Sequence, residues 1–305
     1  MDRELVIVVA CVLGSLAPAQ SAFAQRVTFD RTFDVGASPS LEVSTVRGKI
    51  AVAVGQNGRV VVHGTVTVRV GVDVPADAVA IAERIAANPP VTHSDDVVRL
   101  TAPSDGRDHR AVTVSYVVEV PAPTTVSTTS ESGETNVTGV EGPVVVRTQS
   151  GAIALSQLDG AVQVTTGSGA VDVDTVAGVL TVTTSSSGIV ANNLAGGLKV
   201  RTQSGSVEAT MAGAGAVHVH TGSSGVRLHG VSGPTAVETG SGRIEIWLAP
   251  GAGIDLDALT RSGGVDVRAV KVMGVVDKRH VGGAIGGGGA KVRLVTRSGS
   301  IRIAD

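Results

Sequence analysis

Apolar and polar residues alternate along most of this chain, in short runs separated by turns that contain glycine. From about residue 124 to residue 305 the runs follow the frame Val-x-Thr-x-Ser-Gly-x-Val-x-Val, as in residues 164–173. Alternation with a period of two is typical of strands that bury one face. The Ser-Gly pair recurs about every 18 residues, at Ser132, Ser150, Ser168, Ser187, Ser204, Ser224, Ser241, Ser262 and Ser298. A fixed period of this length indicates one small unit stacked many times.

A second glycine follows each Ser-Gly pair, at Gly142, Gly160, Gly178 and Gly197. Each unit therefore holds two short strands and two turns, with glycine expected to supply positive φ at the corners. One unit cannot bury its apolar face alone, so the predicted fold is all-β, a repetitive β-solenoid or β-helix-like stack of about 18-residue rungs. Equivalent side chains should form ladders, among them Thr148, Thr166, Thr202, Thr239, Thr260 and Thr296. The recurrent serine is expected to be a turn residue whose hydroxyl bonds nearby backbone, and nine equivalent copies argue against a unique nucleophile.

Residues 25–123 differ from the repeats and predict a β-rich capping segment at the first edge of the stack. The pair Asn57-Gly58 between two alternating runs predicts a hairpin. Around residues 75–88 the period changes to that of a helix, which begins near Pro75 and ends at Asn88-Pro89. We expect this to be the only helix of the mature chain, followed by a β-strand-repeat solenoid over residues 124–305.

Residues 1–24 read as a signal peptide, with an apolar stretch from Leu5 to Leu16 and small residues before Gln25. Cleavage before Gln25 would remove the single cysteine, Cys11, so the mature chain would have neither disulfides nor thiol chemistry. A lipoprotein signal acylated at Cys11 is the less favoured alternative. No other stretch is long and apolar enough to cross a membrane, so we expect export to the periplasm or the cell surface.

Charge and composition narrow the classes of partner. The chain has a formal net charge of −2, which becomes about −1 without residues 1–24. A nearly neutral chain gives no electrostatic reason to expect nucleic acid or anionic lipid as a partner. Aromatic residues make up 2% of the chain, which also disfavours stacking sites for sugars or bases.

The repeated frame, the run Tyr116–Pro121 that enters the repeats, and the ending Gly286–Leu294 followed by Thr296–Ile303 resemble the bacterial "putative adhesin" family of β-strand-repeat proteins. The similarity covers essentially the mature chain. It implies an exported adhesin-like β-solenoid, a domain of unknown function with no agreed enzymatic site. The interval from Ser262 to Ser298 is twice the usual period, and we expect Asp277–Gly289 to form a loop there.

Three histidines could hold a metal ion. His218 and His220 would share one face of a strand, and His229 follows near a neighbouring half-rung. Three converging imidazoles can bind zinc. The favoured alternative is an outward-facing polar row with Val217 and Val219 packed inside, so no metal and no cofactor are predicted.

Other candidate sites are weaker. Asp172 with Asp174, and Asp255 with Asp257, place two carboxylates on one strand face, as calcium sites or glycosidases require, but charges on exposed strands usually serve solubility. The glycine-rich run 282–289 lacks the Lys and Ser/Thr of a phosphate loop. Trp247 is either a surface anchor or, as we favour, a partly buried core residue.

Two functional classes remain. The first is a non-enzymatic cell-envelope binding or scaffold protein that contacts an unknown macromolecule through an open edge or its polar ladders. The second is a carbohydrate-active β-helix enzyme, a polysaccharide lyase or glycosidase. We favour the first, and we expect any local function where the period fails, around the helix or around residues 277–289.

Overall fold

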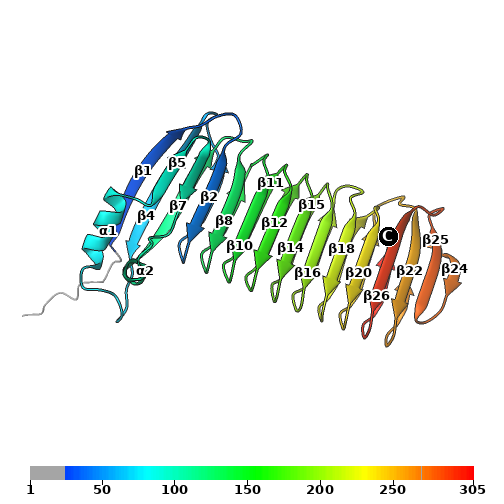
Figure 1. The fold of residues 1–305 in the computed structure, drawn as a ribbon. Coiled ribbons are helices and arrows are strands. Elements are labelled where there is room, and N and C mark those ends of the chain that lie inside the picture. Colours follow the sequence, from blue (N-terminus) through cyan, green and yellow to red (C-terminus); the bar gives the residue numbers. More distant parts are fainter. Residues whose placement is uncertain (1–24, 269) are drawn as a thin grey trace, which may run out of the picture.

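The computed structural model describes residues 25–268 and 270–305, so the predicted signal peptide with Cys11 lies outside the described residues. Within them, strands form two sheets of 13 and 14 strands, which we call sheet A and sheet B. The sheets run the length of an elongated molecule (Figure 1). The predicted all-β solenoid is confirmed.

The strands of sheet A are, in spatial order, β1 (Arg26–Asp34), β4 (Arg59–Val68), β7 (Val112–Val120), β3 (Ile50–Val54), β9 (Thr135–Thr138), β11 (Ile153–Leu158), β13 (Val171–Val176), β15 (Ile189–Leu194), β17 (Val207–Met211), β19 (Val226–Val231), β21 (Ile244–Leu248), β27 (Ile301–Ala304) and β23 (Val265–Val267). Those of sheet B are β24 (Met273–Val276), β25 (His280–Ile285), β22 (Ile254–Thr260), β26 (Ala290–Thr296), β20 (Thr235–Thr239), β18 (Val217–Thr221), β16 (Leu198–Thr202), β14 (Leu180–Thr184), β12 (Val162–Thr166), β10 (Val144–Thr148), β8 (Thr125–Ser130), β2 (Ser40–Thr45), β6 (Val97–Leu100) and β5 (Val91–Ser94).

Each rung contributes one strand to each sheet, and successive rungs pair in parallel without a shift in register over most of the stack. Val164 of β12, for example, lies between Val146 of β10 and Val182 of β14. Neighbouring rungs are therefore ~4.8 Å apart, the usual spacing of hydrogen-bonded strands.

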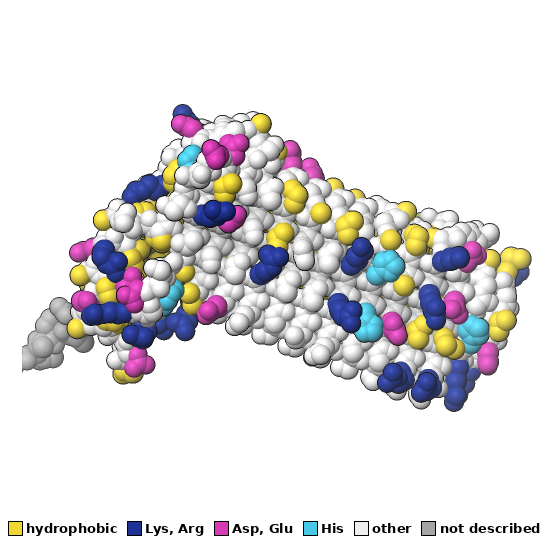
Figure 2. All heavy atoms as spheres, viewed as in Figure 1, with side chains coloured by type: hydrophobic (Ala, Val, Ile, Leu, Met, Phe, Trp, Pro, Cys, Tyr) yellow, Lys and Arg dark blue, Asp and Glu magenta, His cyan; other side chains and the backbone are white. Residues whose placement is uncertain are grey.

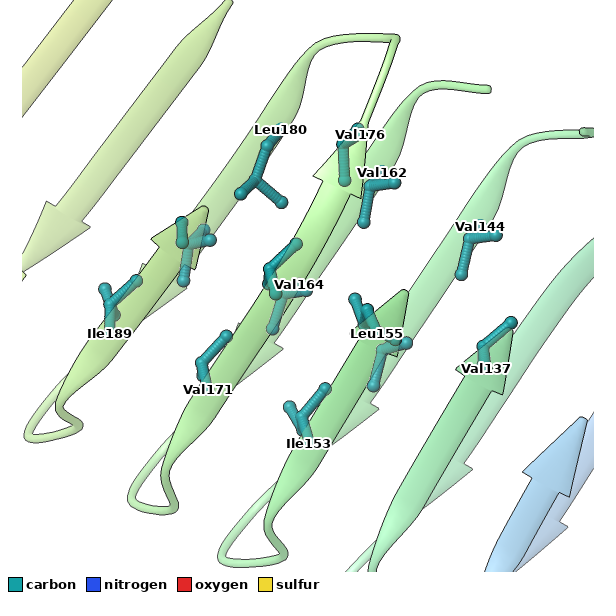
Figure 3. Packing of buried hydrophobic residues seen from close by; sticks show 14 of the residues in the cluster. Val137, Val144, Ile153, Leu155, Val162, Val164, Val171, Val176, Leu180 and Ile189 are labelled. Carbon is teal, nitrogen blue, oxygen red and sulfur yellow. The ribbon is translucent and has the colours of Figure 1, made fainter. Parts of the chain in front are cut away.

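The core lies between the two sheets and consists of columns of identical or similar side chains. Val164, Leu155 and Ile189 point into it from opposite sheets (Figure 3). The threonine ladder predicted from the repeats is confirmed, and it faces inward: Thr148, Thr166 and Thr296 are all buried.

At most Ser-Gly pairs the glycine is required by close approach of a neighbouring rung and not by positive φ, which corrects the expected role; Gly188 and Gly225 have no such contact, and Gly169 has a positive φ. A Cβ on Gly151 would collide with the carbonyl oxygen of Gly133, and one on Gly242 with that of Ser224. Neither glycine has positive φ. The second glycine ladder includes Gly196, not the predicted Gly197, because it is Gly196 that lies against the carbonyl of Gly178.

The turn is held by the threonine two residues before the serine more than by the serine itself. The amide of Gly151 donates to Oγ1 of Thr148 (3.2 Å), and the amide of Gly242 donates to Oγ1 of Thr239 (3.0 Å). The serine hydroxyl bonds backbone at some rungs, as in Ser150 to the carbonyl of Glu131 (3.4 Å). The expected backbone bond of the serine is thus present at some rungs, and the threonine makes such a bond at others.

The N-terminal segment begins with an antiparallel sheet edge and ends in ordinary rungs. β1, β4 and β7 pair antiparallel, whereas β2 and β3 pair in parallel with β8 and β9. The predicted hairpin is wrong, because β3 and β4, which flank the turn at Asn57-Gly58, are separated by β7. Gly58 does adopt the positive φ of a tight turn. However, β4 pairs antiparallel with the long strand β7, which therefore occupies the place beside β4 that β3 would take in a hairpin.

The predicted helix is present as α1 (Ala78–Ala87), whose buried face of Ile81, Ala82 and Ile85 packs on β4 and β1. It is not the only helix, since α2 (Gly106–Ala111) follows. Asp105 caps α2 by accepting from the amide of Arg107 at 2.8 Å. The buried carboxylate of Asp108 binds the guanidinium of Arg84 (2.8 Å), which joins the two helices.

The end of the chain inserts between earlier rungs. β26 pairs in parallel with β20 on one side and with β22 on the other, and β27 lies between β21 and β23. The expected loop at Asp277–Gly289 is wrong: residues 280–285 form β25, paired antiparallel with β24 and β22. The doubled interval between Ser262 and Ser298 thus contains a terminal hairpin rather than a long loop.

Candidate functional site

Strand alternation sends the polar half of each rung to the outside, and on sheet B this gathers basic side chains. Lys199 and Arg201 project from β16, and His218 and His220 from β18, all exposed. The register places Lys199 beside His218 and Arg201 beside His220. Figure 2 shows Lys, Arg and His side chains over this part of the stack.

These side chains border an open hollow, which we call the basic trough. It has a volume of about 640 Å³ and extends from Thr181 on β14 to Arg293 on β26. Ala236 lies between His218 and Arg293 in the register. Its short side chain leaves a gap in a row of long ones, which accounts for the depression.

The trough continues toward the end of the stack into a second hollow of about 630 Å³, which shares His220 and Glu238 with the first and adds Arg261 and Arg297. Among the described residues that line the two hollows, the permanently charged cations are Lys199, Arg201, Arg261, Arg293 and Arg297, and the one carboxylate is Glu238. A region of clear positive charge therefore exists on a chain whose net charge is −2.

Only part of this charge is neutralised by neighbours. Nδ1 of His220 lies 3.5 Å from Glu238, and Nε of Arg293 lies 3.9 Å from Asp257. Within the part of the chain that the structure describes, Lys199 and Arg201 form no ion pair. These two side chains can therefore bind an external anion without first breaking an internal salt bridge.

The three candidate zinc ligands do not come together. His218 and His220 lie on sheet B with Val217 and Val219 buried behind them, as the favoured alternative predicted. His229 is on β19 in sheet A, on the opposite side of the core, where its ring stacks on Trp247 with centroids 4.1 Å apart and planes at 5°. In the described ranges no group of three or more His, Cys, Asp or Glu side chains could hold a metal ion.

Trp247 is a half-buried residue of the outer face, because it is outward in the alternation of β21 and its neighbours Ile246 and Leu248 face the core. The prediction of a core position is therefore wrong, because the side chain of Trp247 points away from the core, although its ring is partly buried. Its packing partner is the ring of His229 on the neighbouring strand β19 and not a side chain of the core.

The carboxylate pairs also lie on outer faces. Asp172 and Asp174 are exposed on β13 of sheet A, and Asp174 accepts a hydrogen bond from Asn193 (3.0 Å). Asp255 and Asp257 are exposed on β22 of sheet B, and Asp257 contacts His280 (3.1 Å). Neither pair lines the basic trough.

The outer face of sheet A carries a row of alternating charge instead of a single-sign surface. Glu208, Arg227, Glu245, Arg302 and Asp266 succeed one another in register. The buried carboxylate of Glu245 lies 3.1 Å from Nε of Arg227 and 3.4 Å from Nη1 of Arg302. These charges satisfy one another, so this face stabilises the stack rather than attracting a charged partner.

Shifted pKa values occur in the N-terminal part. The hydrogen bond from Arg99 holds the pKa of Glu42 below its usual value, and hydrogen bonds from Asn136 and Lys49 lower the pKa of Glu134. Burial raises the pKa of Tyr116, whose hydroxyl donates to the carbonyl of Thr101 (2.8 Å). Glu42, Glu134 and Tyr116 each form a contact within the first rungs.

The basic trough was not predicted from the sequence. A usable signal is present, because Lys199-Val-Arg201 and His218-Val-His220 both alternate basic and apolar residues about one period apart. Arg293 could not be found in this way, since only the insertion of β26 next to β20 brings it to the trough.

Two solved structures similar to this chain come from bacteria. Over 91% of its length the chain is similar to a "putative cell adhesion protein" from Clostridium sporogenes (13% identity, 99% of that chain, TM-score 0.26). It is also similar to a "putative adhesin" from Bacteroides fragilis (14% identity, 91% of this chain and 96% of that chain, TM-score 0.35). Curated proteins show no match to this chain.

None of the described helices is long and apolar enough to cross a bilayer. The profile of the family described as Toastrack DUF4097 matches residues 112–231, from the first residue of β7 to the end of β19. This segment contains Tyr116–Pro121 and part of the repeats on which the family resemblance was based, but not the ending Gly286–Ile303. Residues 112–231 are therefore similar to the Toastrack DUF4097 family, which confirms the resemblance to an adhesin-like family of unknown function.

Proposed function

We propose that the chain is an exported, non-enzymatic, adhesin-like β-solenoid that acts as a binding or scaffold protein of the cell envelope, in the periplasm or at the cell surface. Its contact surface is the basic trough on sheet B. The observation that supports this proposal is the unpaired state of Lys199 and Arg201 beside a hollow of about 640 Å³. Like charges lining a depression raise the local concentration of an oppositely charged ligand.

Binding is favoured over catalysis because of the carboxylates. A glycosidase commonly needs two of them on either side of the scissile bond, but among the described lining residues of the trough Glu238 is the single one. The remaining side chains that face the trough are suited to holding an anion, and the rigid stack of rungs keeps them in place.

Cosedimentation with cell-envelope fragments tests the proposal. The purified chain beginning at Gln25 is mixed with bacterial cell-envelope fragments, and its bound fraction is compared for the native protein, Arg201→Glu and Arg147→Glu. The last two substitutions are closely matched, since Arg147 and Arg201 occupy identical hexapeptides and equivalent exposed positions of β10 and β16. Only Arg201 lines the basic trough.

We expect the native protein and Arg147→Glu to sediment with the fragments and Arg201→Glu to remain in solution. Equal binding by all three proteins would rule out the trough as the contact surface. Mass spectrometry of the protein recovered from cells tests export, with an N-terminus at Gln25 expected. Release of sugars from acidic or neutral polysaccharides would contradict the non-enzymatic part of the proposal.

A further inference from the structure

We propose that the basic trough binds a linear polysaccharide that carries carboxylate groups, such as a chain of uronic acids. This inference rests on the proposed function, because it names the class of ligand for the same surface. The observation that supports it is the spacing of the basic side chains along the stack.

Basic side chains recur along two parallel columns. Lys199 and His218 lie on adjacent rungs of one column, and Arg201 and His220 on adjacent rungs of the other. Rungs are ~4.8 Å apart, and residues two apart on one strand are about 7 Å apart. A thin polymer lying along the stack can therefore contact basic groups of several rungs at once, whereas a small anion would meet only one or two.

The direction of the trough agrees with an extended ligand. The hollow beside Lys199 and Arg201 leads past Glu238 to a second hollow with Arg261 and Arg297. The basic groups are thus distributed along the stack and are not gathered at one point. Spaced carboxylates on a chain match this distribution, since arginine binds carboxylate through two parallel hydrogen bonds.

The other side chains of the trough favour a sugar polymer. Thr181 precedes Lys199 in one column and Thr183 precedes Arg201 in the other. Thr181 is half-buried and Thr183 exposed, and both line the hollow. Hydroxyl groups both donate and accept hydrogen bonds, so they suit the hydroxyls that lie between the carboxylates of a uronic acid chain.

Two other polyanionic ligands, single-stranded nucleic acid and anionic membranes, fit the basic trough less well. Single-stranded nucleic acid is usually held by stacking on aromatic rings, and no Phe, Tyr or Trp is among the described lining residues. The same absence disfavours a sugar site built on stacking, but the carboxylates and hydroxyls of a uronic acid chain are bound through ion pairs and hydrogen bonds instead. Anionic membranes are usually bound by basic groups next to protruding apolar side chains. Among the described residues that line the first hollow, which holds Lys199 and Arg201, no exposed large apolar side chain is found; Leu259 in the second hollow is exposed, and Met273 lies beyond it on β24.

The test measures binding of polygalacturonate to the purified chain beginning at Gln25, by isothermal titration calorimetry at low salt and neutral pH. Dextran serves as the neutral polysaccharide, and single-stranded DNA and phosphatidylglycerol vesicles as the other polyanions. The native protein is compared with Lys199→Glu, Arg201→Glu and the matched control Arg147→Glu. Thermal unfolding of each variant shows whether it has folded.

We expect polygalacturonate to bind and dextran not to bind. Each of Lys199→Glu and Arg201→Glu should weaken binding roughly ten-fold, because a favourable charge contact becomes a repulsive one, and Arg147→Glu should leave it unchanged. Affinity should also fall as salt is raised, since a polyanion releases counterions on binding.

The ligand class is overturned if folded native protein does not bind polygalacturonate, if Arg147→Glu and Arg201→Glu weaken binding equally, or if DNA or vesicles bind as tightly as the polysaccharide. Cosedimentation with envelope fragments separates this failure from failure of the proposed function. If that binding still depends on Arg201 while polygalacturonate does not bind, the surface stands and the ligand class is wrong. If neither binds, both proposals fail.

Discussion

The backbone amide of Gly242 donates a hydrogen bond to Oγ1 of Thr239, 3.0 Å away. Thr239 is buried at the end of β20, and Gly242 lies in the turn that leads from β20 to β21 in the other sheet. This bond therefore ties the interior of a rung to its corner. The equivalent hydroxyl of Thr202 is buried without a hydrogen-bond partner among the described residues, so the repeat offers a direct comparison of the two situations.

We expect Thr239→Val to lower the free energy of unfolding by about 1 to 2 kcal/mol, because the amide of Gly242 loses its acceptor in a buried turn. The same change at Thr202 removes a hydroxyl that bonds nothing and should be neutral or slightly stabilising. Urea unfolding followed by circular dichroism measures both. Equal destabilisation by the two variants would show that the hydrogen bond contributes nothing specific.

A second prediction concerns the contact between rungs at glycine. Gly151→Ala should destabilise the protein by about 2 to 3 kcal/mol, since the new Cβ meets the carbonyl oxygen of Gly133 and must force two rungs apart. Gly106→Ala is the control, because a Cβ there has nothing within 4 Å. Thermal unfolding compares them, and a loss for Gly106→Ala as large as that for Gly151→Ala would refute the packing explanation.

A third prediction uses Tyr116, the single tyrosine of the sequence. Burial raises its pKa in the folded state, whereas an unfolded tyrosine ionises near pH 10. Below about pH 10 both states keep the proton, so the residue adds no pH dependence there. Above that pH only the unfolded state loses the proton, so the free energy of unfolding should fall as pH rises.

Ultraviolet absorbance of the phenolate measures this directly, and ionisation should coincide with unfolding. In Tyr116→Phe the additional alkaline loss should disappear, while stability at neutral pH falls by about 1 kcal/mol with the bond to Thr101. Phenolate absorbance that develops near pH 10 while the circular dichroism stays native would contradict the buried position.

A fourth prediction follows from the inserted end of the chain. Removing residues 290–305 deletes β26 and β27 and leaves β20 and β22 without the strand that joins them. Exposed strand edges promote aggregation, so we expect the shortened protein to aggregate in size-exclusion chromatography. Removal of Asp305 alone, which is exposed and outside β27, should leave the elution profile of the native protein unchanged. A soluble truncated protein with native circular dichroism would show that the insertion is dispensable.

Much of the repetitive part of the fold could be predicted because its signals are local. The alternation around Val164 specifies which side chains face the core, and the threonine and glycine of each frame recur at the corners. The reasons for these residues were harder to find. That Gly151 is required by a neighbouring carbonyl, and that Thr239 rather than Ser241 bonds the turn, depends on distances between rungs.

The candidate site could be predicted much less well. Net charge indicated no reason for an anionic partner, because it adds together side chains that point in opposite directions. Alternate half-rungs go to different sheets, so Lys199 and Arg201 face one side while Glu208 and Glu245 face the other. The same separation places His229 across the core from His218 and prevents the zinc site considered from spacing alone.

By itself the sequence determined that this protein is a stack of two-stranded rungs, since strand alternation and a constant period act between near neighbours in the chain. Only the tertiary structure decided the order of the rungs and which residues lie next to each exposed side chain. Arg293 reaches the basic trough only because β26 inserts beside β20. The physical reason is that a surface site is made of contacts between rungs, and those depend on which strands pair rather than on which follow one another.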